Sequence, residues 1–215
     1  MKRILIALLL AVLTLLAATG IGLGVIHLTD FPYVADIDAL EISEYSGLDH
    51  AEIMANYKAV MVFLTPFSSS DFDLPTLNFS ETGARHFVDC RNVFNGVYLA
   101  AFISLLTLAV VFAMKKLEKR TIVYSGIFTL SIPILLGIAM ATNFDRAFLL
   151  FHAVFFEGET WIFDPAVDEI IRILPSEFFM HCALLIAGFW LIAAATEILF
   201  GMCKTKTSGI SSKDK

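Results

Sequence analysis

The sequence has few cysteines and lacks the glycine patterns that bind nucleotides. Its three cysteines, Cys90, Cys182 and Cys203, are odd in number, scattered and without a CxxC pair. Neither a disulfide framework nor a cysteine zinc site is therefore indicated. No Walker or dinucleotide-binding motif and no internal repeat occurs. The formal net charge of −6 does not favour nucleic acid as a partner, because that needs a basic surface.

Charged residues are also scarce, at 17% of the 215 residues, whereas hydrophobic residues make up 58%. A soluble globular domain is about half apolar and about one quarter charged. Four apolar runs reach the length of about 20 residues that a transmembrane helix needs. They cover residues 4–27, 94–114, 122–141 and 180–202. We therefore expect an all-α polytopic membrane protein, with residues 1–215 forming a single integral membrane domain.

The first apolar run has a second interpretation, a cleaved signal peptide. Lys2 and Arg3 precede a leucine-rich core, and Ala17-Ala18 lies beyond it. The run continues well past Ala18, which favours a retained anchor.

The basic residues divide unevenly between the connections of the four spans. Ten of the fifteen lie before the first span, between the second and third, or after the fourth: Lys2, Arg3, Lys115, Lys116, Lys119, Arg120, Lys204, Lys206, Lys213 and Lys215. Because basic residues accumulate on the cytoplasmic side, both termini, the loop 115–121 and the tail 203–215 are predicted to be cytoplasmic. The connections 28–93 and 142–179 are then external, hold eighteen of the twenty-one carboxylates, and are expected to form a small interfacial cap.

The first external segment contains one clear helical pattern. Residues 29–44 are polar and acidic and indicate a loop with short strands. Apolar residues recur at helical spacing over residues 50–64, with Asp49 as the predicted cap and Pro66 as the break. Ser80 is expected to cap a helix that begins at Glu81 and continues into the second span.

The second external segment is short and aromatic. Phenylalanines recur at three- and four-residue intervals from Phe144 to Phe155, which suits a helix lying in the membrane interface. Trp161 is typical of an interfacial anchor. Asp164-Pro165 predicts a helix over residues 166–174, and Ser176 is a candidate cap for the fourth span.

Two histidines are the candidate catalytic groups. His86 and Asp89 share a helix face, so the carboxylate can hold the imidazole as a general base requires. His152 comes from the other external segment. The alternatives are packed or solvated histidines, a thiol–imidazole pair of Cys90 with His86, and a metal site of both histidines with Asp89 and a third carboxylate. No recognised ligand spacing supports the metal site. The phenylalanines could simply partition into the interface or could line a groove for acyl chains.

Two motifs together resemble the signature of a bacterial family of four-span membrane proteins, the lipoprotein intramolecular transacylases of Gram-positive bacteria. The motifs are FSETGARHFVDCR, residues 79–91, and FHAVFFEGETWIFDPAVDEIIRILPSEFF, residues 151–179. The matching elements are Phe79-Ser80-Glu81, His86, Asp89, Phe151-His152, Phe156, Trp161, Asp164-Pro165, Asp168, Pro175 and Phe178-Phe179, with Asn56-Tyr57 upstream. Cys90 and Gly83-Ala84 depart from the family pattern.

The resemblance implies an intramolecular acyltransferase of the bacterial cell membrane, with its active site on the outer face and no cofactor or metal. The substrate would be a diacylglyceryl-modified lipoprotein held in membrane lipid. Its sn-2 acyl chain would move to the α-amino group of the same N-terminal cysteine, giving the lyso form. We expect His152 to act as the base and His86, oriented by Asp89, as its partner or acid. Substrate contacts are expected from Arg85, Arg91, Tyr57, Phe151, Phe155, Phe156, Trp161 and Asp164.

Two other functions fit the same sequence. One is an interfacial lipid hydrolase or acyltransferase that uses water or another acceptor, and the other is a non-enzymatic membrane scaffold or receptor. A transporter is disfavoured, because Glu197 is the only clear carboxylate within the spans and a substrate path needs polar groups at mid-depth.

Overall fold

The computed structural model describes residues 1–203 of the protein, and all regular structure in that range is helical. The elements in chain order are α1 (Lys2–Leu28), α2 (Tyr33–Ala39), α3 (Ile42–Ser46), α4 (His50–Phe63), α5 (Glu81–Ala113), α6 (Lys119–Thr142), α7 (Phe144–Phe155), the 3₁₀ helix η1 (Glu169–Arg172) and α8 (Ser176–Met202). The predicted all-α class is confirmed. Lys204, Lys206, Lys213 and Lys215, with the rest of the predicted tail, lie outside the described residues.

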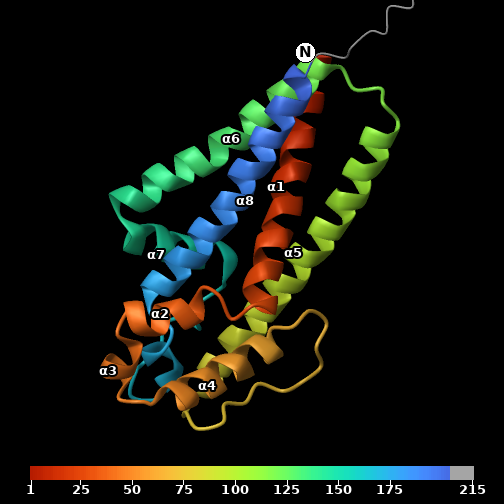
Figure 1. The fold of residues 1–215 in the computed structure, drawn as a ribbon. Helices are drawn as coiled ribbons and strands as arrows, with labels where there is room; N and C mark the ends of the chain where they lie inside the picture. The colour runs from red at the N-terminus through yellow and green to blue at the C-terminus, as the bar shows by residue number, and fades with distance from the viewer. Residues whose placement is uncertain (204–215) are drawn as a thin grey trace, which may run out of the picture.

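Four helices, α1, α5, α6 and α8, are long and apolar enough to cross a membrane. They contain the predicted spans to within a few residues. α1 packs against the other three, and α6 packs most extensively on α8. The four are not parallel. α5 leans away from α1 at the end that carries the N-terminus, and α6 leans away from α8 toward the opposite end (Figure 1).

Three of the spans, α1, α6 and α8, meet at a polar cluster around Glu197 of α8, which is only 7% exposed. Its carboxylate accepts hydrogen bonds from Thr14 of α1 and from Ser125 and Thr129 of α6. Gly126 lies where α6 and α8 approach most closely, since a side chain there would press against the Ala194 carbonyl oxygen. Hydrogen bonds and close backbone approach are what hold helices together in lipid, where the hydrophobic effect no longer does so.

A cap of short helices and loops covers one end of the spans (Figure 1). It has a core of its own, formed by side chains from α2, α3, α4, η1 and the starts of α5 and α8. At its centre the rings of Tyr33 and Tyr57 stack with centroids 3.8 Å apart, and Phe178 meets Tyr33 edge-on at 5.1 Å. The Tyr33 hydroxyl donates to the Ile173 carbonyl, which joins α2 to the segment before α8.

Several predicted elements of the cap are confirmed. α4 begins after Asp49, whose side chain accepts from the Glu52 amide, and α5 begins after Ser80, whose hydroxyl accepts from the Gly83 amide. α5 continues without interruption into the second span. The aromatic helix is α7, capped by Asn143.

Residues 29–44 were predicted as a loop with short strands, and this is wrong. They form α2 and α3. Tyr33 and Ile37 lie four residues apart and are both almost fully buried, as is Ile42. One buried apolar pair in α2 and one buried apolar residue in α3 form too short a pattern to indicate a helix in an acidic sequence. Helices this short are stable only because the cap core buries them.

The helix predicted over residues 166–174 is also wrong, since only η1 forms there. Asp164 does cap, but its carboxylate holds a turn through the Ala166 amide. The backbone then leaves helical geometry because the Glu169 amide donates to the Asn78 carbonyl. Ser176 begins α8 without capping it, and its hydroxyl instead contacts Glu177.

Candidate active site

Two buried histidines meet where the cap joins the spans. His86 comes from the second turn of α5 and is 7% exposed, and His152 comes from the last turn of α7 and is 9% exposed. Their ring centroids lie 5.8 Å apart, with the planes tilted by 32°. The structure thus brings together the two histidines that the sequence singled out from different segments.

His152 is held by its own helix. Its Nδ1 lies 2.8 Å from the Phe148 carbonyl oxygen, one turn earlier in α7. Because a carbonyl only accepts, Nδ1 must carry the proton and Nε2 is left with a free lone pair. Nε2 has no hydrogen-bond partner among the described residues, and it is not among the atoms that are sealed from solvent. This tautomer is the one that a general base requires.

His86 is held differently. Its Nε2 lies 3.4 Å from the Sγ atom of Cys90, and its Nδ1 is buried with no partner in the described part of the chain. The expected contact with Asp89 is absent, which corrects the sequence prediction. Side chains in a helix lean toward its N-terminus, so residue i+4 lies directly over residue i, and here Cys90 occupies that position.

Aromatic rings surround the pair. Phe156 lies 4.7 Å from His86 and 5.5 Å from His152 between ring centroids, and Trp161 lies 5.0 Å from His152. Phe163 meets His86 edge-on at 5.4 Å. Burial lowers the pKa of His152 below its ordinary 6.5, although the bond to the Phe148 carbonyl partly opposes this. His152 is therefore neutral at ambient pH.

The start of α5 is fixed to the second external segment by Asp168. This carboxylate is 5% exposed and accepts from both the backbone amide and the hydroxyl of Ser80. A side chain at Gly83 would collide with it, so this departure from the family pattern makes room for the contact. A negative charge at a helix N-terminus is stabilising. Asp168 thereby joins the segment after His152 to the helix that carries His86.

A model of the lipoprotein intramolecular transacylases, Lit, matches residues 4–179 of the chain. The chain belongs to the Lit family. Among solved structures, the in meso structure of the membrane-integral Lit from Bacillus cereus is similar, with a TM-score of 0.84 and 29% identity over 93% of this chain and 94% of that chain. Two variants of that protein, with one histidine changed to arginine or to alanine, match with TM-scores of 0.78 and 29% identity. They cover 93% of this chain and 90% and 92% of theirs.

A relative from Aquifex aeolicus, described only as uncharacterized, is 30% identical over 110 residues. The match covers 51% of this chain and 50% of the relative, so the chain spans about half the length of this curated relative. The Lit structures, in contrast, match over nearly the whole length, so the four-span membrane fold is shared throughout.

The remaining residues predicted from the Lit resemblance divide into two groups. Phe156 and Trp161 contact the histidines, and Phe151 contacts His152 and Phe155 while remaining 47% exposed. The others make no hydrogen bond or ring contact with either imidazole in residues 1–203. These are Phe155, which contacts Phe151; Arg85, paired with Glu81; Arg91, bonded to the Ser70 carbonyl and lying over Phe63; Tyr57, in the cap core; and Asp164, in its turn.

The contact of Cys90 with His86, which the sequence offered as an alternative, is present. Two other contacts were missed. Phe163 forms part of the aromatic shell around His86. A carboxylate–imidazole pair does exist, but between Asp36 and His181, with 2.7 Å between Oδ1 and Nδ1. Those two residues are far apart in sequence, so no spacing pattern indicates the pair. Within the described residues no three metal-ligating side chains gather, and the alternative metal site is not formed.

Proposed function

We propose that this chain moves the sn-2 acyl chain of an S-diacylglyceryl cysteine to the α-amino group of that same cysteine. The product is an N-acyl, S-monoacylglyceryl lipoprotein, the lyso form. One observation carries the proposal: a Lit-family fold holds two unionised imidazoles, 5.8 Å apart, inside an aromatic shell at the edge of its spans. An amine attacking an ester needs proton transfer and orientation but no enzyme nucleophile, and this arrangement supplies both.

The reaction is an isomerisation in which every atom is retained. The amine nitrogen attacks the ester carbonyl carbon, and His152 Nε2 takes the proton that the nitrogen loses. The bond between the carbonyl carbon and the glyceryl oxygen then breaks, and that oxygen receives the proton back. Since an α-amino group has a pKa of about 7.7–8.0 and an imidazole about 6.5, both neutral partners are present at ambient pH.

The two histidines have different roles in this scheme. His152 is the base, because its Nδ1 proton is committed to the Phe148 carbonyl and its Nε2 is free. His86 donates to the oxygen that becomes negative in the tetrahedral intermediate. Such a donor is most effective where water is excluded, and Phe156 and Phe163 exclude it here.

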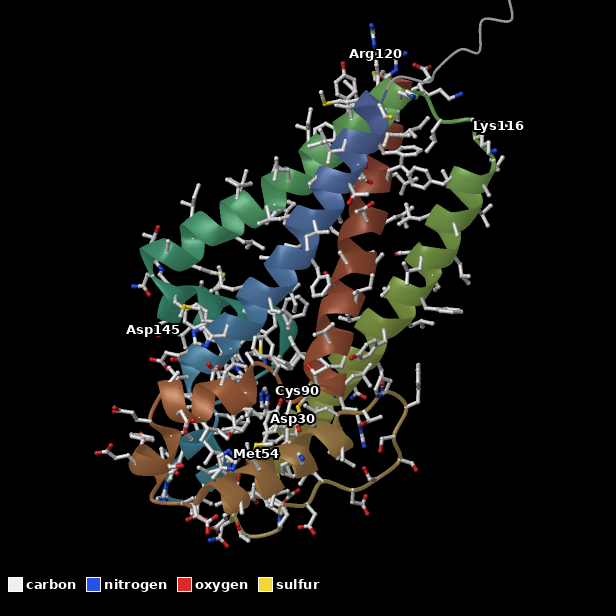
Figure 2. All side chains as sticks on the ribbon, viewed as in Figure 1. Asp30, Met54, Cys90, Lys116, Arg120 and Asp145 are labelled. Atoms are coloured by element: carbon white, nitrogen blue, oxygen red, sulfur yellow. The ribbon has the colours of Figure 1, made fainter. Side chains whose placement is uncertain are left out.

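The substrate reaches this site from the bilayer. Exposed apolar side chains of α7 and of the loop after it suit contact with acyl chains and the membrane interface: Leu149, Leu150, Phe151, Val154, Phe155 and Ile162. Lys116 and Arg120 lie at the end of the spans that carries the N-terminus, whereas Cys90 and Asp30 lie at the cap end (Figure 2). The positive-inside rule then supports a cytoplasmic N-terminus and a cap on the outer face of the bacterial cell membrane.

Mass spectrometry of a reporter lipoprotein's N-terminal peptide tests the proposal. The wild-type chain, expressed in a host that makes only the diacyl form, is expected to yield the lyso form. His152→Ala and His86→Ala are expected to yield almost none in the time that the wild-type chain needs for complete conversion. His50→Ala is the matched control, because His50 is exposed at the start of α4, in the cap but outside the pair.

The same spectra distinguish the other functions. Free fatty acid without N-acyl peptide would identify a lipid hydrolase. A lipoprotein unchanged by the wild-type chain would indicate a scaffold or receptor. If both histidine variants still produce the lyso form, the assigned roles are refuted.

A further inference from the structure

Cys90 lies beside His86, yet the proposed reaction assigns it no step. Its Sγ atom is 3.4 Å from His86 Nε2 and within hydrogen-bonding range for sulfur. Its side chain is partly buried, packs against the cap core, and follows His86 by one turn of α5. A contact with the imidazole of a reacting histidine suggests a role that packing alone would not require.

No second hydrogen bond orients His86. The Nδ1 atom is sealed from solvent and has no partner in residues 1–203, and Asp89 does not reach the ring. The edges of Phe156 and Phe163 confine the ring plane, but aromatic contacts do not distinguish one imidazole nitrogen from the other. Without the thiol, nothing in these residues selects the tautomer of His86.

The chemistry of the two groups sets the direction of this hydrogen bond. A thiol has an ordinary pKa of about 8.5 and carries its proton at ambient pH, whereas sulfur is a weak acceptor. An imidazole nitrogen is the better acceptor, so the thiol donates to Nε2. A neutral imidazole has one N–H group, which is then on Nδ1. That proton is left as an unpaired donor inside the shell that His86 shares with His152.

We propose that Cys90 is a positioning residue that holds His86 in the tautomer protonated on Nδ1. This buried Nδ1–H then donates to the ester carbonyl oxygen once the substrate enters the aromatic shell. Cys90 itself gains and loses no atom in the reaction. The tautomer follows from the contact and from the donor chemistry of the thiol, and only the identity of the acceptor of Nδ1–H rests on the proposed function. Both rings are thus protonated on Nδ1, but a different group is left without a partner. In His152 it is the Nε2 lone pair, and in His86 it is the Nδ1 proton.

Three variants test this role. Cys90→Ala removes the donor, Cys90→Ser retains one in a smaller side chain, and Cys203→Ala is the control for loss of an exposed cysteine at the end of α8. Cys90→Ala is expected to lower kcat about tenfold with little change in KM, which corresponds to one hydrogen bond. Cys90→Ser is expected to recover to within about threefold of wild type, because a hydroxyl also donates.

Nitrogen NMR of ring-labelled histidine supplies a readout that does not need activity. The His86 signals, assigned by their loss in His86→Gln, are expected to show the Nδ1–H tautomer in wild type and in Cys90→Ser, and a tautomer mixture in Cys90→Ala. An Nε2–H tautomer in wild type, equal impairment of the two Cys90 variants, or full activity of Cys90→Ala would each overturn the proposal. If the wild-type chain makes no lyso form, the proposed function fails while the NMR result still decides the role of Cys90.

Discussion

The two histidine regions are buried to nearly the same extent but are built in different ways. His86 lies on α5, a helix of 33 residues whose start is bonded to the cap through Asp168 and whose length packs on α1. His152 lies on α7, a helix of 12 residues with a single buried side chain, His152 itself. The cap fixes the first histidine, whereas the second sits on a helix whose other large apolar side chains are mostly exposed.

The difference extends to the imidazoles. A backbone carbonyl of α7 accepts the Nδ1 proton of His152, so the tautomer does not need a particular partner side chain. The side chain of residue 90 contacts His86, so this part of the site depends on which residue stands there. The base on His152 and the donor on His86 are therefore fixed by different contacts, so a substitution can change one without the other.

The largest expected effect comes from replacing each histidine by glutamine. Glutamine cannot take up a proton, so His152→Gln is expected to reduce the rate of lyso-form formation about a thousandfold, within the range of general-base catalysis. A glutamine amide can still donate, so His86→Gln is expected to lose only about tenfold, and His86→Ala about a hundredfold. Rates measured under single-turnover conditions check this order. Equal losses for the two glutamine variants would mean that the roles are not divided as proposed.

A smaller effect is expected from removing the side chain that anchors the start of each helix. Asp168→Ala leaves the Ser80 amide and hydroxyl without their buried acceptor, which should cost about 2–3 kcal/mol of stability. Asn143→Ala removes only the exposed cap of α7, worth about 1 kcal/mol. Thermal unfolding of the detergent-solubilised protein compares the two, with exposed Asp71→Ala as the control. A larger loss for Asn143→Ala would show that α7, not α5, is the better anchored element.

The sequence predicts the parts of this molecule that depend on composition or on local spacing. The four spans follow from long apolar runs, and Asp49 and Ser80 identify two helix starts because each cap bonds an amide only three residues away. Both histidines follow from their segments. In each of these cases the information lies in a continuous stretch of the sequence.

The parts that were missed depend on contacts across the fold. Asp89 and Cys90 are both within reach of His86 on a helix, and only the packing of Phe156 and Phe163 from another segment decides that the ring turns to Cys90. The sequence predicts Asp168 to lie in a helix over residues 166–174. Its carboxylate instead binds Ser80, which lies 88 positions earlier. Tyr57 stacks on Tyr33 in the cap core, and no local spacing pattern indicates this contact.

The smallest expected effect is a shift in the pH profile. Burial lowers the pKa of His152, so the base stays neutral below pH 6.5 and is lost only as the pH falls through the lowered value. The substrate amine titrates separately near pH 8, so the rate falls about tenfold per pH unit below that point and more steeply once His152 is protonated. His86 is the titratable group whose ring contacts His152. Burial, and then the positive charge of a protonated His152, lower the pKa of His86 to about 4, so His86 stays neutral when His152 takes up its proton.

Trp161→Ala sharpens this test, because it admits water beside His152 while leaving the Phe148 bond intact. The steeper part of the pH profile is expected to move up toward pH 6.5, since weaker desolvation restores the ordinary pKa of His152. Phe163→Ala is the control, because it opens the aromatic shell at His86 instead of at His152. His86 acts as a neutral donor and not as the base. This variant should therefore lower the rate and shift the steeper part of the pH profile less than Trp161→Ala does. An equal shift in both variants would indicate that the two imidazoles titrate as one unit.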